Sequence, residues 1–313
     1  MLITYYDPVT FERKGTISRA ISIIHNKRLY SVGSIQITLD KNTDPPPVDS
    51  LILYKDVSGI VMEIDDSKEW NTILCYDMKG ITKFRYIEQE FTYTQKTPEY
   101  IIKDMAQKML LNGDRTVAGL RINPDSGNGE ELESYTVKSG NFGEFLDRFC
   151  TENQIGYNVT FNESNIVFDV IKERTNANVV FSGAEGTLED SVYIVSNYDM
   201  QNAVYYKDNE DIAYVGDKKG ILRREGMADT KDSAEAVLKE NQTAETLSGT
   251  AGVKLRFGLD YSIGDIVKVM HGNYITEKVV SEVEQVWESG LVRETPVFGD
   301  EQRNPIKKLF GGG

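Results

Sequence analysis

The sequence predicts an α+β protein that is mostly β, in which two β-rich regions, each with a helix, flank a small α+β unit. Apolar and polar residues alternate through most of the chain, which is the period of a half-buried strand. Helical spacing replaces that alternation in only a few stretches. A chain of 313 residues is also long for one core, so about two or three domains are expected.

The first β-rich region covers about residues 1–95. In SIQITLDK (34–41), Ile35, Ile37 and Leu39 share one face of a predicted strand. The following DPPPVDS interrupts regular structure, because proline fixes φ and has no amide donor. Further strands are predicted in the segments SLILYKD (50–56), GIVMEIDD (59–66) and NTILCYDM (71–78).

Two helices are predicted in the middle of the chain. TPEYIIKDMAQKMLLNG begins with Thr97 as N-cap and Pro98 in the first turn, and it stops at Asn112-Gly113. After a polar, acidic loop (123–134), Asn141 and Glu144 form a capping box for a second helix. Its apolar face has helical spacing and consists of Phe142, Phe145, Leu146, Phe149 and Cys150.

The rest of the chain returns to strands. A hairpin is predicted at 156–171, then strands at 177–183, 191–197, 202–208, 212–217 and 220–226, a helix at 232–247, and a meander at 258–299. Two β-rich domains are expected, at 1–112 and 175–299. Residues 113–174 are expected to form an inserted α+β domain, and residues 300–313 a flexible tail. No internal repeat is evident in the sequence.

Composition narrows the class of protein. The net charge of −14 disfavours binding to nucleic acid or an anionic membrane, and solubility is its simplest interpretation. No apolar run approaches the about 18–20 residues that span a bilayer, and the N-terminus has no secretory-signal pattern. Cys75 and Cys150 lie in apolar patterns and are expected to be small core residues.

No motif for catalysis is present. His25 and His271 lie where turns are expected, and their spacing with the two cysteines matches no zinc site. Glu130-Glu131 and Asp300-Glu301 would form a carboxylate pair only if the fold brought two such groups to the right separation, and solvated surface is the simpler interpretation. We therefore expect no catalytic residue, metal or cofactor, and no enzyme.

Several blocks in order along the chain resemble phage tail hub proteins, in particular the siphovirus Gp37-like tail proteins related to myophage baseplate hubs. The blocks are NKRLYSVGSIQITL, SGIVMEI with YDMKGITKFR, IKERTNANVVFS, GLDYSIGDIVKV and ETPVFG. Glu173 stands where the family has Asp. The matching residues are Gly33, Arg85, Arg174, Thr175, Phe181, Ser182, Asp260, Tyr261, Gly264 and Asp265.

From the residues themselves, Gly264-Asp265 suits a turn that leads Ile266 and Val267 into a strand. Arg174 is suited to pair with a carboxylate or cap a strand edge, and ordinary surface charge is an equal alternative.

The resemblance implies two tail-tube-like β-barrel or sandwich domains, each with a flanking helix, and a small inserted α+β domain. It implies a homotrimer with pseudo-sixfold symmetry that joins a hexameric tail tube or distal tail protein to a trimeric spike, fibre or tail-associated lysin. DNA or the tape measure protein would pass through the ring. The implied location is the tail of a virion, or of a phage-tail-like bacteriocin or contractile injection system, assembled in the host cytoplasm.

Two other functions stay open. A tail-associated cell-wall hydrolase would need a catalytic domain, for which the chain shows no segment after Gly299. A carbohydrate-binding module would need exposed aromatic rows, and Trp70 and Trp287 lie in separate segments. Most tyrosines fall in strand patterns, where cross-strand packing explains them.

Overall fold

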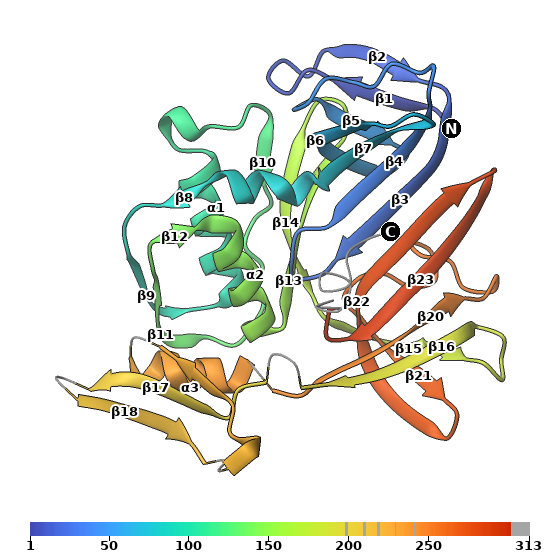
Figure 1. The fold of residues 1–313 in the computed structure, drawn as a ribbon. Coiled ribbons are helices and arrows are strands. Elements are labelled where there is room, and N and C mark those ends of the chain that lie inside the picture. Colours follow the sequence, from blue (N-terminus) through green and yellow to red (C-terminus); the bar gives the residue numbers. More distant parts are fainter. Residues whose placement is uncertain (198–199, 209–210, 218–219, 229, 241, 302–313) are drawn as a thin grey trace.

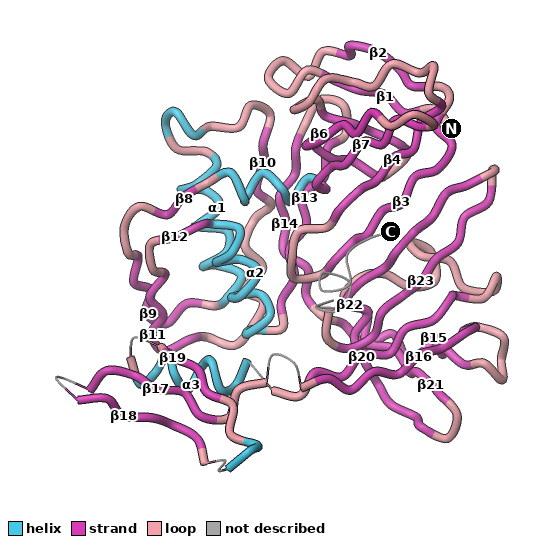
Figure 2. The backbone as a smooth tube through the Cα atoms, viewed as in Figure 1, coloured by secondary structure: helices cyan, strands magenta, loops and turns pink. Residues whose placement is uncertain are grey.

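The computed structural model describes residues 1–197, 200–208, 211–217, 220–228, 230–240 and 242–301. One large sheet crosses the molecule, and a helical module lies beside it (Figures 1 and 2). Among the described residues, no helix is long and apolar enough to cross a membrane.

The N-terminal part of the large sheet is wholly antiparallel. Along the sheet its strands follow the order β3-β4-β7-β6-β5-β1-β2. Their bounds are β1 (Ile3–Tyr6), β2 (Arg13–Ile17), β3 (Ala20–Arg28), β4 (Ser34–Asp40), β5 (Leu51–Tyr54), β6 (Val57–Asp66) and β7 (Trp70–Asp77). The predicted strands at 34–41, 50–56, 59–66 and 71–78 are confirmed.

A helical module follows. It contains η1 (Met78–Phe84), β8 (Tyr86–Ile87), β9 (Phe91–Lys96), α1 (Pro98–Leu110), η2 (Gly113–Arg115), β10 (Leu120–Ile122), β11 (Leu132–Val137), β12 (Gly140–Asn141), α2 (Phe142–Asn153), β13 (Ile155–Phe161) and β14 (Ile166–Lys172). Helix α1 packs against α2, β9, β10 and β14, and α2 packs against η1 and β13. The division into domains at 112, 174 and 299 stays a prediction.

The C-terminal part returns to the large sheet. It contains β15 (Arg174–Ser182), β16 (Leu188–Ser196), β20 (Ala244–Ala251), β21 (Asp265–His271), β22 (Tyr274–Glu288) and β23 (Leu291–Gly299). Between β16 and β20 lies a small unit of β17 (Ala203–Asp208), β18 (Asp211–Gly216), η3 (Gly220–Leu222), β19 (Glu225–Met227) and α3 (Lys231–Glu240). Helix α3 packs on the sheet formed by β17 and β18, and Ala234 is buried there.

Two sandwich-like β units share this sheet. Four strands of the first unit lie in the order β3-β4-β7-β6, and four of the second lie in the order β16-β20-β23-β22. Strand β22 pairs antiparallel with β3, so hydrogen bonds continue from one unit into the other. The predicted fold class, two tube-like β units with a small α+β unit between them, is confirmed in its open, sandwich-like form.

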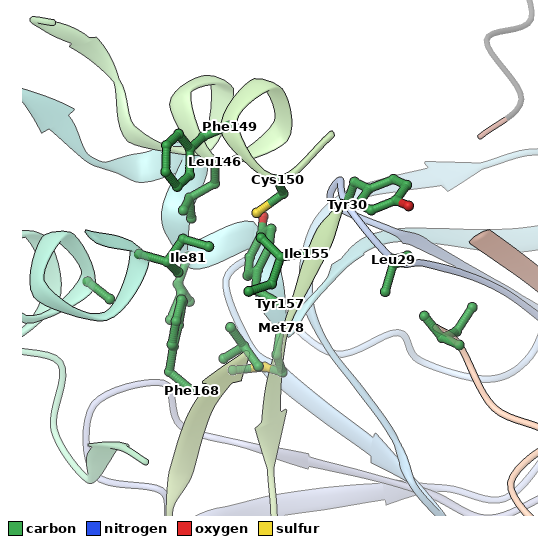
Figure 3. Close-up of a cluster of buried hydrophobic side chains, with 14 of the residues drawn as sticks. Leu29, Tyr30, Met78, Ile81, Leu146, Phe149, Cys150, Ile155, Tyr157 and Phe168 are labelled. Atoms are coloured by element: carbon green, nitrogen blue, oxygen red, sulfur yellow. The ribbon is translucent and has the colours of Figure 1, made fainter. Parts of the chain in front are cut away.

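Two large apolar clusters form the core. One fills the module and reaches both β units, and the other lies within the N-terminal unit, where Trp287 of β22 joins it. Figure 3 shows the first cluster, where Met78 and Ile81 of η1 gather with Tyr157 of β13 and residues of α2. Cys75 and Cys150 are buried free thiols, as predicted.

Both predicted N-caps in the middle of the chain are confirmed. Thr97 Oγ1 accepts a hydrogen bond of 3.3 Å from the Tyr100 amide at the start of α1. Asn141 Oδ1 accepts one of 3.2 Å from the Glu144 amide at the start of α2. These polar groups satisfy amide donors that the first helical turn leaves without an intrahelical partner.

Two predictions in the second β unit were wrong at their boundaries. The helix predicted at 232–247 is α3, which ends at Glu240, and Leu247 belongs to β20, where it pairs with Tyr193 and Phe298. Tertiary pairing therefore overrides the helical spacing there. The strand predicted at 220–226 is a 3₁₀ turn followed by the short β19, and Gly220 has a φ of 62°.

A buried histidine lies in the seam between the two β units. His25 of β3 pairs with Gln285 of β22 on one side and with Ile35 of β4 on the other. It is 6% exposed, and its Nδ1 has no hydrogen-bond partner within the described part of the chain. Burial, reinforced by the nearby charges of Lys27 and Lys79, lowers the pKa of His25 to about 3.

His25 should make the fold sensitive to acid. The folded pKa lies below the unfolded value, so its contribution to stability is present above about pH 6.5 and is lost as the pH falls towards 3. Between pH 7 and pH 5, the free energy of unfolding should fall by about 2 kcal/mol more in the wild type than in His25→Gln. Urea unfolding of both proteins at the two pH values measures this, and equal losses would contradict it.

Candidate assembly surfaces

The residues first considered for chemistry lie apart. No cluster of three or more His, Cys, Asp or Glu side chains able to hold a metal occurs in the described parts of the chain. The turn expected at His25 was wrong, because His25 is buried inside β3 and pairs with strands on both sides. His271 is the last residue of β21, directly before a turn, and its Nδ1 lies 2.8 Å from Ser191 Oγ of β16. Glu130 and Glu131 are exposed. These placements favour a structural interpretation of each residue.

The loop between β3 and β4 is held by a buried lysine. Lys79 is 1% exposed, and its Nζ donates hydrogen bonds to the carbonyl oxygens of Arg28 at 2.6 Å, Leu29 at 3.1 Å and Ser31 at 2.9 Å. The ammonium also lies 4.4 Å from the ring centre of Tyr157. Burial lowers the pKa of Lys79, and the charge of Asp77 opposes that shift.

Other parts of the chain bind the same loop. The Leu29 amide donates to the Ser281 carbonyl of β22 at 2.8 Å, and its own carbonyl accepts from the Tyr157 amide at 3.3 Å. Tyr30 Oη donates to Glu173 Oε1 at 2.5 Å, at the end of β14. The loop is therefore the point where the first unit, the module and the second unit meet, and Figure 3 shows Leu29 and Tyr30 beside the module core.

The start of the predicted tail also reaches this loop. Glu301 Oε1 accepts a hydrogen bond of 2.6 Å from the Tyr30 amide, and its other oxygen accepts from the Ser31 hydroxyl. Asp300 Oδ2 accepts from the Glu245 amide at 2.9 Å. Asp300 and Glu301 thus bind separate main-chain groups. The remainder of the predicted tail, 302–313, lies outside the described residues.

Arg174 and Asp265 meet where β15 and β21 begin. Arg174 Nε donates to Asp265 Oδ1 at 2.6 Å, and the Arg174 amide donates to the Gly264 carbonyl at 3.0 Å. Asp265 is fully buried and also accepts from Asn176 Nδ2 at 3.0 Å and the Ser262 amide at 2.9 Å. Of the alternatives for Arg174, pairing with a carboxylate is the one observed.

Next to this pair lies an aromatic group. The fully buried Phe181 ring packs edge-on to Tyr261 with centroids 5.0 Å apart, and it lies 4.7 Å from the ring of Phe298. Tyr261 Oη donates to Glu294 Oε2 at 3.3 Å, so the phenol is satisfied inside the core. This group ties β15 to β23.

The neighbouring matched residues shape turns. Gly264 has a φ of 88°, and a Cβ there would lie 2.9 Å from Ile171 Cγ2. Asp260 Oδ2 accepts from the Arg256 amide at 2.8 Å, and the Ser182 amide donates to Thr187 Oγ1 at 2.8 Å. Thr175 pairs with Ile266 in the parallel ladder between β15 and β21.

Gly33 and Arg85 lie on either side of η1. A Cβ on Gly33 would lie 2.3 Å from the Asn26 carbonyl oxygen and 2.6 Å from Asp77 Oδ2, so glycine lets Asp77 approach the loop and cap η1. Arg85 Nε donates to the Met109 carbonyl at 3.2 Å, at the end of α1. The matched residues therefore fall into separate structural contacts in the first unit, the module and the second unit.

Sequence reasoning missed Lys79, Glu173 and Glu301 as anchors of the 28–31 loop. Lys79 lies in the block YDMKGITKFR, but a lysine in a 3₁₀ turn has no periodic pattern that marks it as buried. For Glu301, the sequence suggests a solvated surface carboxylate or a member of a carboxylate pair, and neither predicts its contact with the loop. Their partners lie at distant positions in the chain, so the sequence carries no local signal for them.

Two exposed strand edges complete the candidate surfaces. Strand β16 is one end of the main strand order of the large sheet, and it exposes Val192 by 51%, Ile194 by 43% and Val195 by 54%. Strand β6 pairs with β5 only as far as Ile60, so the outer edge of 62–66 has no ladder partner in the described chain. Exposed apolar edge strands are surfaces on which another chain can add a strand.

Removing the Lys79 ammonium should weaken the whole fold. Lys79→Met keeps an apolar stem but removes one hydrogen bond from each of three carbonyl oxygens, which should lower the free energy of unfolding by about 2–4 kcal/mol. Chemical denaturation measures this. The matched control is Lys14→Met, which removes an exposed pair with Glu12 and should change stability by less than about 0.5 kcal/mol. Equal effects of the two variants would contradict the anchoring role.

Comparison with known proteins finds similarity in structure alone. No protein-family model matches the chain, and no curated protein matches its sequence. Prophage tail protein gp18 from Listeria monocytogenes has a TM-score of 0.58 at 10% identity, over 98% of this chain and 97% of that one. The 43 kDa tail protein of prophage MuSo2 from Shewanella oneidensis has a TM-score of 0.58 at 12% identity, over 95% of each chain.

A third neighbour comes from an assembled tail. A chain in the structure of the phage P2 baseplate in its activated conformation has a TM-score of 0.54 at 10% identity, over 97% of this chain and all of that one. The chain therefore has the fold of prophage tail and phage baseplate proteins, and the likeness extends over nearly its whole length.

Proposed function

We propose that this protein is a structural tail hub, three copies of which form a ring of six similar β units. The observation that carries the proposal is the seam between β22 and β3, which joins two units of the same strand order side by side within one chain. Three chains so built present six units to a hexameric tube and three modules to a trimeric spike or fibre. The full-length structural likeness to tail and baseplate proteins supports this assignment.

One face of the large sheet is suited to line a passage. Ser22, Thr38 and Thr72 lie side by side on adjacent strands, and Glu288 and Asp65 end that row. The next row on this face consists of Val286, Ile24, Gln36 and Leu74 and ends at Glu63. The opposite face carries Ile23, Ile37 and Ile73, which are buried in the core of the first unit. The first face is therefore mixed: one row is polar with a carboxylate at each end, and the next row is mostly apolar.

Carboxylates on such a face would repel a polyanion, so that the polyanion would move through the channel without binding to its wall. We propose that it surrounds the channel through which DNA or the tape measure protein passes, because a carboxylate surface does not retain phosphate groups. The module, on the other side of the seam, is the part available to a spike, fibre or lysin. Assembly of the ring in a virion tail, or in a phage-tail-like particle, belongs to the same proposal.

The ring should be visible in the mass of the purified protein. Native mass spectrometry over a concentration series is expected to show a trimer, because each chain supplies two of six units. A stable dimer would contradict a threefold hub. If the protein is a monomer alone, the same measurement with the tail tube protein should show three copies of this chain in the complex.

The carboxylate face should matter for passage and not for folding. Changing Glu284 and Glu288 of β22 to Lys places cations on the proposed channel wall away from the sheet edges, which should reduce infectivity of the phage that encodes the protein while tail assembly continues. Plaque counts and electron micrographs of the particles measure the two effects. The control changes Glu130, Glu131 and Glu133, which lie around the start of β11 in the module, to Lys. Unchanged infectivity of the first variant would exclude this role.

A further inference from the structure

The two β units repeat each other in detail, beyond their strand order. In β6 the register with β7 shifts between Val61 and Glu63, and in β22 the register with β23 shifts between Val280 and Glu282. The Asp49 amide donates to the Val61 carbonyl at 2.8 Å, and the Gly264 amide donates to the Val280 carbonyl at 3.0 Å.

The backbone and sequence at these points also agree. Asp49 and Gly264 both have positive φ, 69° and 88°. The segment IVMEID (60–65) corresponds to VVSEVE (279–284), with a Glu after each bulge and an apolar residue after each Glu. Glu63 therefore stands where Glu282 stands, and Asp65 stands where Glu284 stands.

The same correspondence extends to the first strands of the units. In the second unit, one row of paired residues runs from Tyr193 through Leu247 to Phe298. In the first unit, the equivalent row runs from His25 through Ile35 to Cys75. Counting along each strand from these positions, Ile194 corresponds to Asn26 and Ser196 corresponds to Arg28. Strand β16 is thus the counterpart of β3.

Within the chain, the last strand of one unit pairs with the first strand of the other. Glu282 lies opposite Arg28, Glu284 lies opposite Asn26, and the ladder continues to Glu288 opposite Ser22. Arg28 Nε is 3.4 Å from Glu282 Oε2. The Leu29 amide extends the contact by donating to the Ser281 carbonyl at 2.8 Å.

One copy of the chain leaves the second such seam open. Among the residues that the structure describes, the edge of 62–66 on β6 has no ladder partner, and β16 pairs through its ladder with β20 alone. These edges lie far apart in the molecule, β6 in the upper part of Figure 1 and β16 at the lower right, so a single chain cannot join them. The exposed apolar side chains of β16 stand where β3 carries its contacts with β22.

We propose that β6 of one copy pairs antiparallel with β16 of the next copy, which repeats between chains the seam that β22 and β3 form within a chain. The expected register places Glu63 opposite Ser196 and Asp65 opposite Ile194. This inference rests on the proposed ring, and it names the strands that close it. The contact joins two different surfaces of identical chains, which is the type of contact that generates rings.

Paired cysteines test this register directly. Directly opposed residues in antiparallel strands have Cα atoms about 4.5–5.5 Å apart, within reach of a disulfide. Oxidised D65C/I194C should therefore run as a covalent trimer on a non-reducing gel and as a monomer after reduction. Each single variant should remain unlinked, since Cys75 and Cys150 are buried. The matched control T16C/I194C tests β2, at the other end of the sheet, as the partner.

Each outcome decides a separate point. A covalent trimer supports the pairing, and linked species longer than three would uphold the pairing but overturn the threefold ring. If D65C/I194C forms a native trimer but no disulfide, the pairing is overturned and the ring stays. A native trimer in which T16C/I194C forms a disulfide has the same meaning. Absence of both the trimer and the disulfide, when the tail tube protein is also present, would overturn the ring as well.

A charge exchange provides a second readout that needs no oxidation. Ile194→Asp places a carboxylate opposite Asp65 at an exposed site, so it should lower the trimer fraction at least tenfold without lowering the Tm of the monomer. Adding Asp65→Lys in the same chain should restore the trimer. If Ile194→Asp leaves the trimer fraction unchanged, or if Asp65→Lys does not restore it, the proposed register is wrong.

Discussion

The contact on which the molecule depends is the one between the Lys79 ammonium and the main chain of the 28–31 loop. A buried charge is tolerable only where hydrogen bonds replace its lost water, and here three carbonyl oxygens and an aromatic ring do so. Because Ser281, Tyr157 and Glu301 bind the same loop, its position fixes how the two β units and the module lie against one another. Gly33 belongs to the same arrangement, since its missing side chain admits Asp77.

The seam between β22 and β3 joins the two β units. It turns two separate β units into one sheet, in which one face of the first unit is buried in the core and the other carries a polar row with carboxylates at its ends. Hydrogen bonds between the main chains of β22 and β3 fix which residue lies opposite which. Side-chain contacts alone would allow more than one alignment of the two strands. His25 is buried in this seam opposite Gln285, and burial lowers its pKa. The imidazole is therefore uncharged at neutral pH.

The residues that carry the resemblance to tail hub proteins are structural in this molecule. The buried Asp265 carboxylate accepts hydrogen bonds from three donors. Phe181 packs between two aromatic rings, and Arg85 donates to the carbonyl oxygen of Met109 at the end of α1. Such contacts fix turns and strand positions within this chain. They require particular geometry at a few turns and leave the rest of the surface free to change.

The sequence by itself determined the local structure: the alternation in SIQITLDK, the caps at Thr97 and Asn141, and the final meander all formed as predicted. These depend on neighbours within a few residues, which a sequence displays. Tertiary structure alone decided that Leu247 joins a strand, that Lys79 is buried, and that the units repeat each other. Each of those depends on partners far away in the chain. The two units repeat each other in strand register, bulges and hydrogen bonds, while their amino-acid sequences agree over only a short segment.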